Sequence, residues 1–211
     1  MISTYEKLIK DATEIMMQNG YSGTSVQMIA EKVKVSKSTV IHYFKSKEGI
    51  LLAILGNFIP SAIAEFSPVV NDRSLKGVEK LRQFICFHLQ IIAKSGDVYT
   101  LNIREARYLS TESRRIIENY QREYENMLVK IVDQIKKEDD CLFKNIDTHV
   151  AAKAIMGMCN SPTIWYKKGG LLSISEIANQ FFGVLTAREK IDRRFQRPRP
   201  SANGPGSQLS S

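Results

Sequence analysis

The sequence predicts an all-α fold, with a small N-terminal domain of three helices and a larger helical C-terminal domain. Apolar residues recur at spacings of three and four along most of the 211-residue chain, which is the period of an amphipathic helix. Alternating patterns of strand length are scarce. We expect the domains to span residues 1–48 and 49–190, with a basic and disordered tail at residues 191–211.

The first three predicted helices are short and closely spaced. Residues 4–18 form the first, and the following "NG" ends it. The second begins after Thr24 or Ser25, either of which can cap a helix. The third begins at Ser36 and ends near residue 44. Only "KVS" separates the second from the third, so these two helices are predicted to form a helix-turn-helix.

The remaining segments predict the helices of the second domain. One helix begins at Ser46, and the polar link "VVNDRSLKG" follows it. Ser74 or Gly77 opens the next, which "KSGD" breaks. Caps and apolar periodicity then predict four further helices, at residues 98–109, at 112–137, from Asp147 to about 162 or 166, and from Ser173 or Ser175 to about 190.

Composition excludes several classes of protein. Three separated cysteines and three histidines form no zinc or disulfide pattern, so buried free thiols are expected at Cys86, Cys141 and Cys159. No Ser-His-Asp set, HExxH motif or glycine-rich phosphate loop is present, so an enzyme is not expected. No apolar run reaches membrane-spanning length and no signal peptide begins the chain, so a cytoplasmic location without membrane contact is expected.

Charge alone is weak evidence for nucleic-acid binding. The net charge is +8, but the first 50 residues hold seven basic and five acidic residues, a net of only +2. The last 24 residues hold six basic and two acidic residues, which is half of the excess. The local pattern of side chains must therefore support any claim of DNA binding.

The third helix has the pattern of a DNA-reading helix. Val40 and Phe44 share one face, while Ser38 and His42 point away from it. Small hydroxyl groups, histidine and lysine on the outer face match the base edges and phosphates of a major groove. Two other interpretations remain, because the Ser-Lys-Ser-Thr start can be only a solvated cap and His42 can be merely exposed.

The segment "NGYSGTSVQMIAEKVKVSKSTVIHYFKSKEGIL" resembles the DNA-binding domain of the TetR/AcrR family of bacterial transcriptional regulators, over residues 12–51. The chain departs from the family at Lys34, where glycine is usual in the turn, and at Ile41, where tyrosine is common. The resemblance implies a dimeric, ligand-responsive repressor of a palindromic DNA operator, without a cofactor. The implied DNA contacts are Thr24, Ser25, Ser36, Lys37, Ser38, Thr39, His42, Tyr43 and Lys47.

The last two predicted helices have small residues that permit close helix packing. They are "THVAAKAIMGMCNSPTIWY" and "ISEIANQFFGVLTA", which include Gly157 and Gly183. In the family these helices pair across a two-fold axis, so the resemblance implies a homodimer. The alternative is that both faces only fill the core of the monomer.

Two C-terminal segments, "IREARYLSTESRRIIENYQREYENML" and "GMCNSPTIWYKKGGLLSISEIANQFFGVL", resemble the branch of the family that responds to acyl-CoA thioesters. Arg104, Arg107, Lys167 and Lys168 are the implied partners of the CoA phosphates. The implied acyl pocket is formed by Phe84, Phe87, His88, Ile91, Tyr108, Tyr124, Met127, Met156, Asn160 and Trp165. Each of these can instead be a core residue, and an effector-independent architectural DNA-binding protein is the alternative function.

Overall fold

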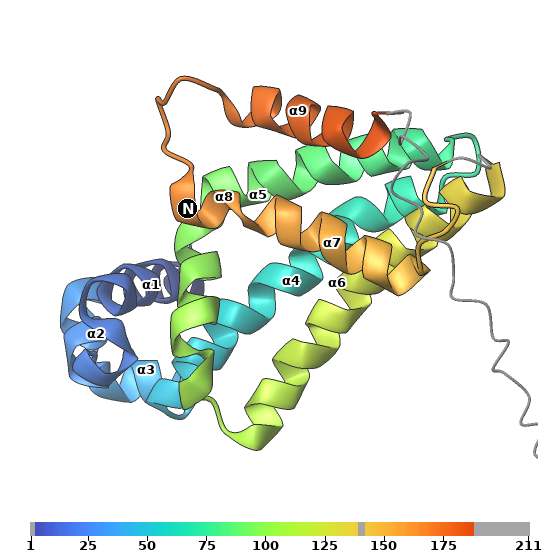
Figure 1. Cartoon of the computed structure of the whole chain (residues 1–211). Helices are drawn as coiled ribbons and strands as arrows, with labels where there is room; N and C mark the ends of the chain where they lie inside the picture. Colours follow the sequence, from blue (N-terminus) through green and yellow to red (C-terminus); the bar gives the residue numbers. More distant parts are fainter. Residues whose placement is uncertain (1–2, 139–141, 188–211) are drawn as a thin grey trace, which may run out of the picture.

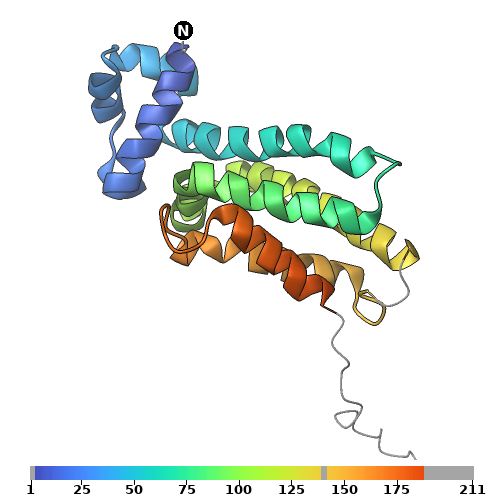
Figure 2. The same cartoon turned by 90° about the horizontal axis from the view of Figure 1, so that it is seen from above.

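The computed structural model describes residues 3–138 and 142–187, which form helices and connecting loops with no strand among them. The all-α prediction is confirmed. The helices are α1 (Thr4–Gly23), α2 (Val26–Val33), α3 (Lys37–Phe44), α4 (Lys47–Asn71), α5 (Gly77–Glu105), the 3₁₀ turn η1 (Ala106–Tyr108), α6 (Thr111–Glu138), α7 (Thr148–Asn160), α8 (Pro162–Trp165) and α9 (Ile174–Thr186). The helices α1, α2 and α3 lie together at one end, and the remaining helices lie side by side beyond them (Figures 1 and 2).

The N-terminal helices follow the predicted pattern. Gly20 has φ 69° and ψ 170°, so α1 is kinked at the predicted stop and continues for one short turn. Ser25 caps α2 and Ser36 caps α3. Lys34, in the turn between them, has φ 62° and ψ 47°, the left-handed conformation that glycine adopts most easily. The side chains of Val40 and Phe44 are buried in the N-terminal core, as predicted.

Helix α4 belongs to both halves of the molecule. Ser46 caps it, and it runs through Pro60 and Pro68 to Asn71. Its first turns bury Leu51 and Leu55 in the core shared with α1, α2 and α3. Its second half buries Ala62 and Phe66 in the core of the C-terminal helices. A single helix therefore connects the two cores.

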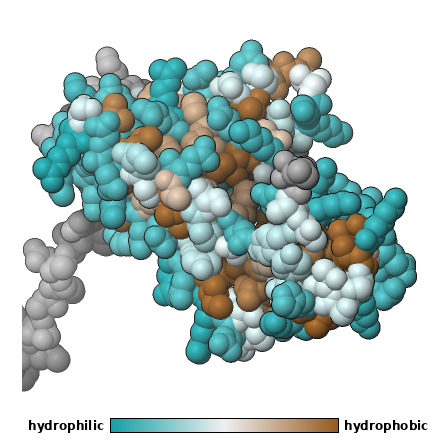
Figure 3. All heavy atoms as spheres, turned by 180° about the vertical axis from the view of Figure 1, so that it is seen from behind, coloured by the Kyte–Doolittle hydropathy of each residue, from teal (hydrophilic) through white to brown (hydrophobic). Residues whose placement is uncertain are grey.

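The expectation that no segment reaches membrane-spanning length was wrong for α4, which is long and apolar enough to cross a bilayer by length and composition. A core helix of a water-exposed protein meets the same criterion, and α4 contributes to both cores. The face shown in Figure 3 mixes hydrophilic and apolar side chains, without a continuous apolar belt. Packing thus accounts for the buried third of the apolar window of α4.

Helix α5 differs from the prediction of two separate helices. The "KSGD" segment produces a kink at Ser95 (φ −132°, ψ 28°), after which the helix continues to Glu105. Residues on both sides of the kink, such as Leu89 and Leu101, are completely or almost completely buried. Packing on both sides therefore keeps the chain helical through a segment that is unfavourable locally.

Helices α7 and α9 begin where the sequence predicts, whereas the short α8 was expected to be the end of the same helix as α7. Asp147 caps α7 by accepting from the backbone N–H groups of His149 and Val150. Ser173 caps α9 in a capping box with Glu176. Cys159 is a buried free thiol as predicted, and burial raises its pKa to about 12. The predicted tail at 191–211 and Cys141 lie outside the described residues.

Candidate nucleic-acid interface and ligand pocket

The outer face of α3 displays a connected set of hydroxyl groups. The Ser36 Oγ accepts a hydrogen bond from the backbone N–H of Thr39 at 3.0 Å. The same oxygen lies 2.7 Å from the Ser38 Oγ and 2.8 Å from the Thr39 Oγ1. Lys37 and Ser38 are exposed, while Thr39 is half-buried. These groups are held in a fixed arrangement that can donate to and accept from base edges.

Aromatic and basic side chains extend this surface beyond the end of α3. Tyr43 is 43% exposed, and its ring lies 6.1 Å from that of Tyr5 and 5.9 Å from that of His42. Lys45, which was not among the predicted DNA contacts, is exposed and follows Phe44 at the end of α3. The ion pairs found in the described part of the chain involve neither Lys37 nor Lys45, so neither charge is neutralised by a carboxylate there. The Lys45 Nζ donates to the carbonyl oxygen of His42 at 3.2 Å and has further N–H groups for a phosphate.

Lys47, at the start of α4, contacts the end of α1 and the residue that follows it. Its Nζ donates to the carbonyl oxygens of Tyr21 and Thr24, at 3.0 Å each. The same ammonium lies 4.3 Å from the centroid of the Tyr21 ring, which is a cation–π contact. Lys47 therefore holds the start of α4 against the end of α1, in addition to its expected role toward the DNA backbone.

The expected phosphate contact by the Thr24 side chain is not supported. Thr24 is only 2% exposed, and its Oγ1 donates to the carbonyl oxygen of Gly20 at 2.8 Å. The exposed Ser25 is the residue that caps α2, with its Oγ accepting from the backbone N–H of Met28. Sequence alone left both caps open, because threonine and serine have similar capping chemistry.

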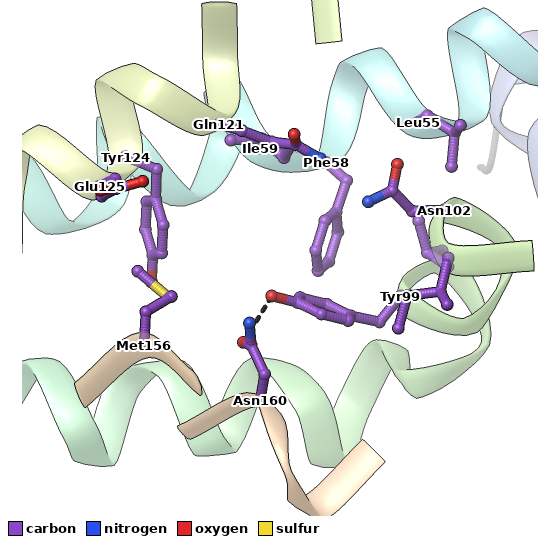
Figure 4. A pocket seen from close by; sticks show the side chains of 12 residues that line it. Leu55, Phe58, Ile59, Tyr99, Asn102, Gln121, Tyr124, Glu125, Met156 and Asn160 are labelled. Carbon is purple, nitrogen blue, oxygen red and sulfur yellow. Dashed lines mark hydrogen bonds between the residues drawn. The ribbon is translucent and has the colours of Figure 1, made fainter. Parts of the chain in front are cut away.

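A cavity of about 320 Å³ lies between α4, α5, α6 and α7 (Figure 4). Its walls are mainly apolar, with a few polar groups pointing inward, as is usual for sites that bind small molecules. The lining residues are Leu55, Phe58 and Ile59 of α4, Val98, Tyr99, Asn102 and Ile103 of α5, Gln121, Tyr124 and Glu125 of α6, and Met156 and Asn160 of α7.

A chain of hydrogen bonds forms the polar end of the cavity. The Oδ1 of Asn160 accepts from the Tyr99 hydroxyl at 2.6 Å, a contact drawn in Figure 4. The same oxygen lies 2.8 Å from the Nε2 of His88, whose Nδ1 lies 3.2 Å from the Tyr124 hydroxyl. A neutral imidazole with its proton on Nε2 satisfies every contact, because Nδ1 then accepts from Tyr124.

The polar chain is uncharged near neutral pH. Burial lowers the pKa of His88 to about 4, although its hydrogen bond to Asn160 acts in the opposite direction. Burial also raises the pKa of Tyr99 to about 12 and raises that of Tyr124 still further. The cavity therefore presents neutral donors and acceptors.

Three of the predicted pocket residues line this cavity, namely Tyr124, Met156 and Asn160, and His88 lies directly behind them. The other predictions need correction. Phe84 is fully buried in the core, and Phe87 stacks on Phe66 with ring centroids 5.0 Å apart. Ile91 and Met127 border two different surface depressions.

The basic and aromatic residues predicted near the pocket mouth lie elsewhere on the surface. Trp165 and Lys167 border a separate depression after α8, next to the exposed Lys168. Tyr108 packs on Tyr21 of the N-terminal domain. The remaining two, Arg104 and Arg107, are exposed at the end of α5 and in η1, and Arg104 follows the lining residue Ile103 directly.

Sequence reasoning missed the whole contribution of α4 and α5 to the cavity. Leu55, Phe58 and Ile59 resemble ordinary core residues on an apolar helix. Tyr99 and Asn102 carried a detectable signal, because two polar side chains three positions apart face the same side of a helix. The predicted break at "KSGD" obscured that pattern, since it placed them in a separate short helix.

A DNA-reading helix-turn-helix joined by one long helix to a helical domain with an internal cavity defines a ligand-responsive type of DNA-binding regulator. Comparisons with known proteins agree with this class. The family model described as "Bacterial regulatory proteins, tetR family" matches residues 8–54. The model described as "Tetracyclin repressor-like, C-terminal domain" matches residues 74–188, more than half of the chain. The chain belongs to the TetR family of transcriptional regulators, and it is not an enzyme.

Relatives extend over nearly the whole chain. The Fatty acid metabolism regulator protein of Bacillus subtilis (strain 168) is 23% identical over 184 residues, which are 87% of this chain and 94% of that protein. The crystal structure of AibR in complex with isovaleryl coenzyme A and operator DNA has a TM-score of 0.76 at 24% identity, over 87% and 98% of the two chains. FadR from Bacillus subtilis, in complex with stearoyl-CoA, has a TM-score of 0.72 at 24% identity, over 86% and 97%.

Proposed function

We propose that this TetR-family regulator is a dimeric repressor that binds a palindromic operator through α3, and that a CoA thioester entering the cavity releases it. One observation carries the proposal most directly. Helix α4 begins at Lys47, beside the DNA-reading helices, and supplies Leu55, Phe58 and Ile59 to the cavity wall. A ligand in the cavity therefore contacts the same helix that connects to the N-terminal domain.

Opposition between effector and DNA follows from this arrangement. The proposal requires that α4 takes one orientation when the protein binds DNA and another when it binds the effector. The acyl group favours the orientation that leaves more space in the cavity, and the operator favours the other. The coupling is then reciprocal, so that DNA weakens effector binding by the same factor as effector weakens DNA binding. A regulator of this kind acts on DNA in the cytoplasm.

The polar end of the cavity favours a neutral carbonyl over a carboxylate. None of the twelve lining residues is basic. The one lining carboxylate, Glu125, is already paired with Lys153 at 2.8 Å. The Asn160 oxygen is engaged by Tyr99 and His88, so its amide N–H groups remain available to a thioester carbonyl. A free acid would bring an unpaired charge into an apolar site, which is strongly unfavourable.

Two relatives support the choice of effector class. The AibR structure contains isovaleryl coenzyme A, and the FadR structure contains stearoyl-CoA. In the present chain, Arg104 is the nearest in sequence to the cavity among the four expected phosphate partners, because it follows the lining residue Ile103, which is 66% exposed. Its Nε lies 3.9 Å from the Glu105 carboxylate. An exposed cation contributes modestly to phosphate binding, since water and salt screen it.

The dimer is supported by the exposed faces of the last helices. Val150 of α7 is 59% exposed, and Val184 of α9 is 70% exposed. Gly157 and Gly183 face open space, where a second helix can approach closely. A two-fold dimer also presents two copies of α3, as a palindromic operator requires.

A thermal-shift panel tests the effector class without knowledge of the operator. The full chain is melted with CoA, with CoA thioesters of different acyl groups, and with the corresponding free acids. We expect at least one thioester to raise the melting temperature by stabilising the folded state, while its free acid and CoA alone do not. No shift with any thioester would favour the alternative, an effector-independent DNA-binding protein.

A further inference from the structure

One side-chain atom in the described part of the chain is buried without a hydrogen-bond partner, and it belongs to a residue that lines the cavity. The atom is the Oδ1 of Asn102, on α5. Native proteins leave few buried amide oxygens unpaired, because burial removes water without replacing its hydrogen bond. An orphaned acceptor in a cavity wall is therefore a sign of a missing donor.

The other polar groups at this place do not provide that donor. The hydroxyl groups of Tyr99 and Tyr124 both point toward the polar chain, where they meet Asn160 and His88. The Asn160 oxygen already receives two contacts, so this end of the cavity offers a ligand mainly a donor. Asn102 supplies the complementary acceptor.

Asn102 also has a favourable position relative to the polar chain. It is three residues after Tyr99 on the same helix face, about 4.5 Å further along α5. In Figure 4 it lies across the cavity from Met156, with Phe58 and Tyr99 between them. In Figure 4 the amide nitrogen of Asn102 faces Phe58 and its oxygen faces α4. The terminal torsion of an asparagine is broad and roughly two-fold, so that a turn of the amide group brings Oδ1 to a ligand.

We propose that the acyl group of the effector carries a hydroxyl that donates to Asn102, so that the preferred effectors are compact hydroxyacyl thioesters. This inference rests on the proposed function. The thioester carbonyl meets the Asn160 amide, and a hydroxyl a few bonds away reaches the acceptor one helical turn along α5. A cavity of about 320 Å³ is at the lower end of the range of ligand pockets, ~300–1,000 Å³, which favours short acyl groups.

Matched thioester pairs test the proposal. The full chain is titrated calorimetrically with butanoyl-, hexanoyl- and octanoyl-CoA and with their 3-hydroxy counterparts. We expect the hydroxy member of the best pair to bind about 10-fold more tightly, the order expected when a buried acceptor gains its donor. Asn102→Leu should remove this preference, so that the hydroxy and unsubstituted members of the pair bind with equal affinity. Gln121→Leu, at another lining residue, is the matched control and should retain the preference.

Three outcomes would overturn the proposal in different ways. Equal affinity for both members of every pair in the wild type would exclude recognition of a hydroxyl. If Asn102→Leu weakens the binding of both members of a pair equally, the Asn102 oxygen accepts from an N–H of the CoA arm, which all thioesters share. Neither result affects the effector class. If no thioester binds the wild-type chain, the proposed function itself fails, and the hydroxyl preference fails with it.

Discussion

The ring of Tyr21, at the end of α1, stacks on the ring of Tyr108, with centroids 4.9 Å apart and an angle of 21° between the planes. This contact joins the N-terminal domain to η1, which directly follows α5 and its cavity-lining residues. The Lys47 ammonium also contacts the Tyr21 ring.

A second contact joins the start of α4 to the corner before α6. The Glu48 carboxylate accepts from the backbone N–H of Ser110 and the hydroxyl of Ser113. The start of α4 and the corner before α6 are thus held together.

The Tyr21–Tyr108 contact leads to a prediction about coupling. Replacing Tyr108 by alanine removes the stack without touching the cavity or α3. Effector affinity and DNA affinity, each measured alone, should change little. The factor by which effector weakens DNA binding should fall, from the 5- to 150-fold typical of such coupling to roughly 3-fold or less. Tyr108→Phe keeps the ring and should keep most of the coupling. Full coupling in Tyr108→Ala would exclude this contact as a connection between the sites.

The buried His88 predicts that stability depends on pH. Its folded-state pKa of about 4 is below the usual histidine pKa of 6.5, so the unfolded chain binds the additional proton between these values. Stability is therefore greatest above pH 6.5 and falls as the pH decreases toward 4, by up to about 3 kcal/mol. Urea denaturation at pH 7 and pH 5 measures the change.

Two variants isolate the contribution of His88. His88→Gln should show a flatter pH dependence between 4 and 6.5, whereas His149→Gln, at an exposed histidine, should behave as wild type. An unchanged slope in His88→Gln would show that other groups cause the pH dependence.

The turn of the helix-turn-helix contains a removable strain. Lys34 has a left-handed backbone, which costs a residue with a side chain about 1 kcal/mol relative to glycine. Lys34→Gly should therefore raise the free energy of unfolding by about that amount. Lys10→Gly, at an exposed helical position in α1, should lower it by about 1 kcal/mol instead. A loss of stability in Lys34→Gly would mean that contacts of the lysine side chain stabilise the fold by more than the backbone strain destabilises it.

The DNA-binding surface predicts a division of roles between neighbouring residues. Lys37 is exposed and outside the ion pairs of the described residues, so Lys37→Ala should weaken operator and random DNA alike. The salt dependence of binding should fall by about one unit, since one phosphate contact is lost. Thr39→Ala should instead reduce the preference for operator over random DNA. Fluorescence anisotropy at several salt concentrations measures both, and identical behaviour of the two variants would contradict the assignment.

The helix-turn-helix could be predicted from sequence because its determinants are local. The caps at Ser25 and Ser36, the stop at Gly20 and the inward face of Val40 and Phe44 each depend on residues within one or two helical turns. Even the left-handed turn at Lys34 could be anticipated, since the departure from glycine was visible in the sequence.

The cavity could not be predicted in the same way, because four helices distant in sequence form it. Asn160 was recognised as an amide on an apolar helix, but its partners Tyr99 and His88 lie 61 and 72 positions earlier. The face that α4 presents to the cavity depends on how α5 and α6 pack against it. Apolar periodicity identifies a buried side chain, but it does not distinguish a filled core from a cavity wall.

Release of operator DNA by a thioester is the most direct test of the account. The labelled operator, isolated from upstream of the neighbouring genes, is titrated with the full chain in the presence of saturating CoA thioesters or their free acids. We expect at least one thioester to raise the dissociation constant for the operator, and operator DNA to lower the affinity for that thioester by the same factor. The free acids should have no effect. Unchanged operator binding in the presence of a thioester that demonstrably occupies the cavity would contradict the claim that α4 couples the two sites.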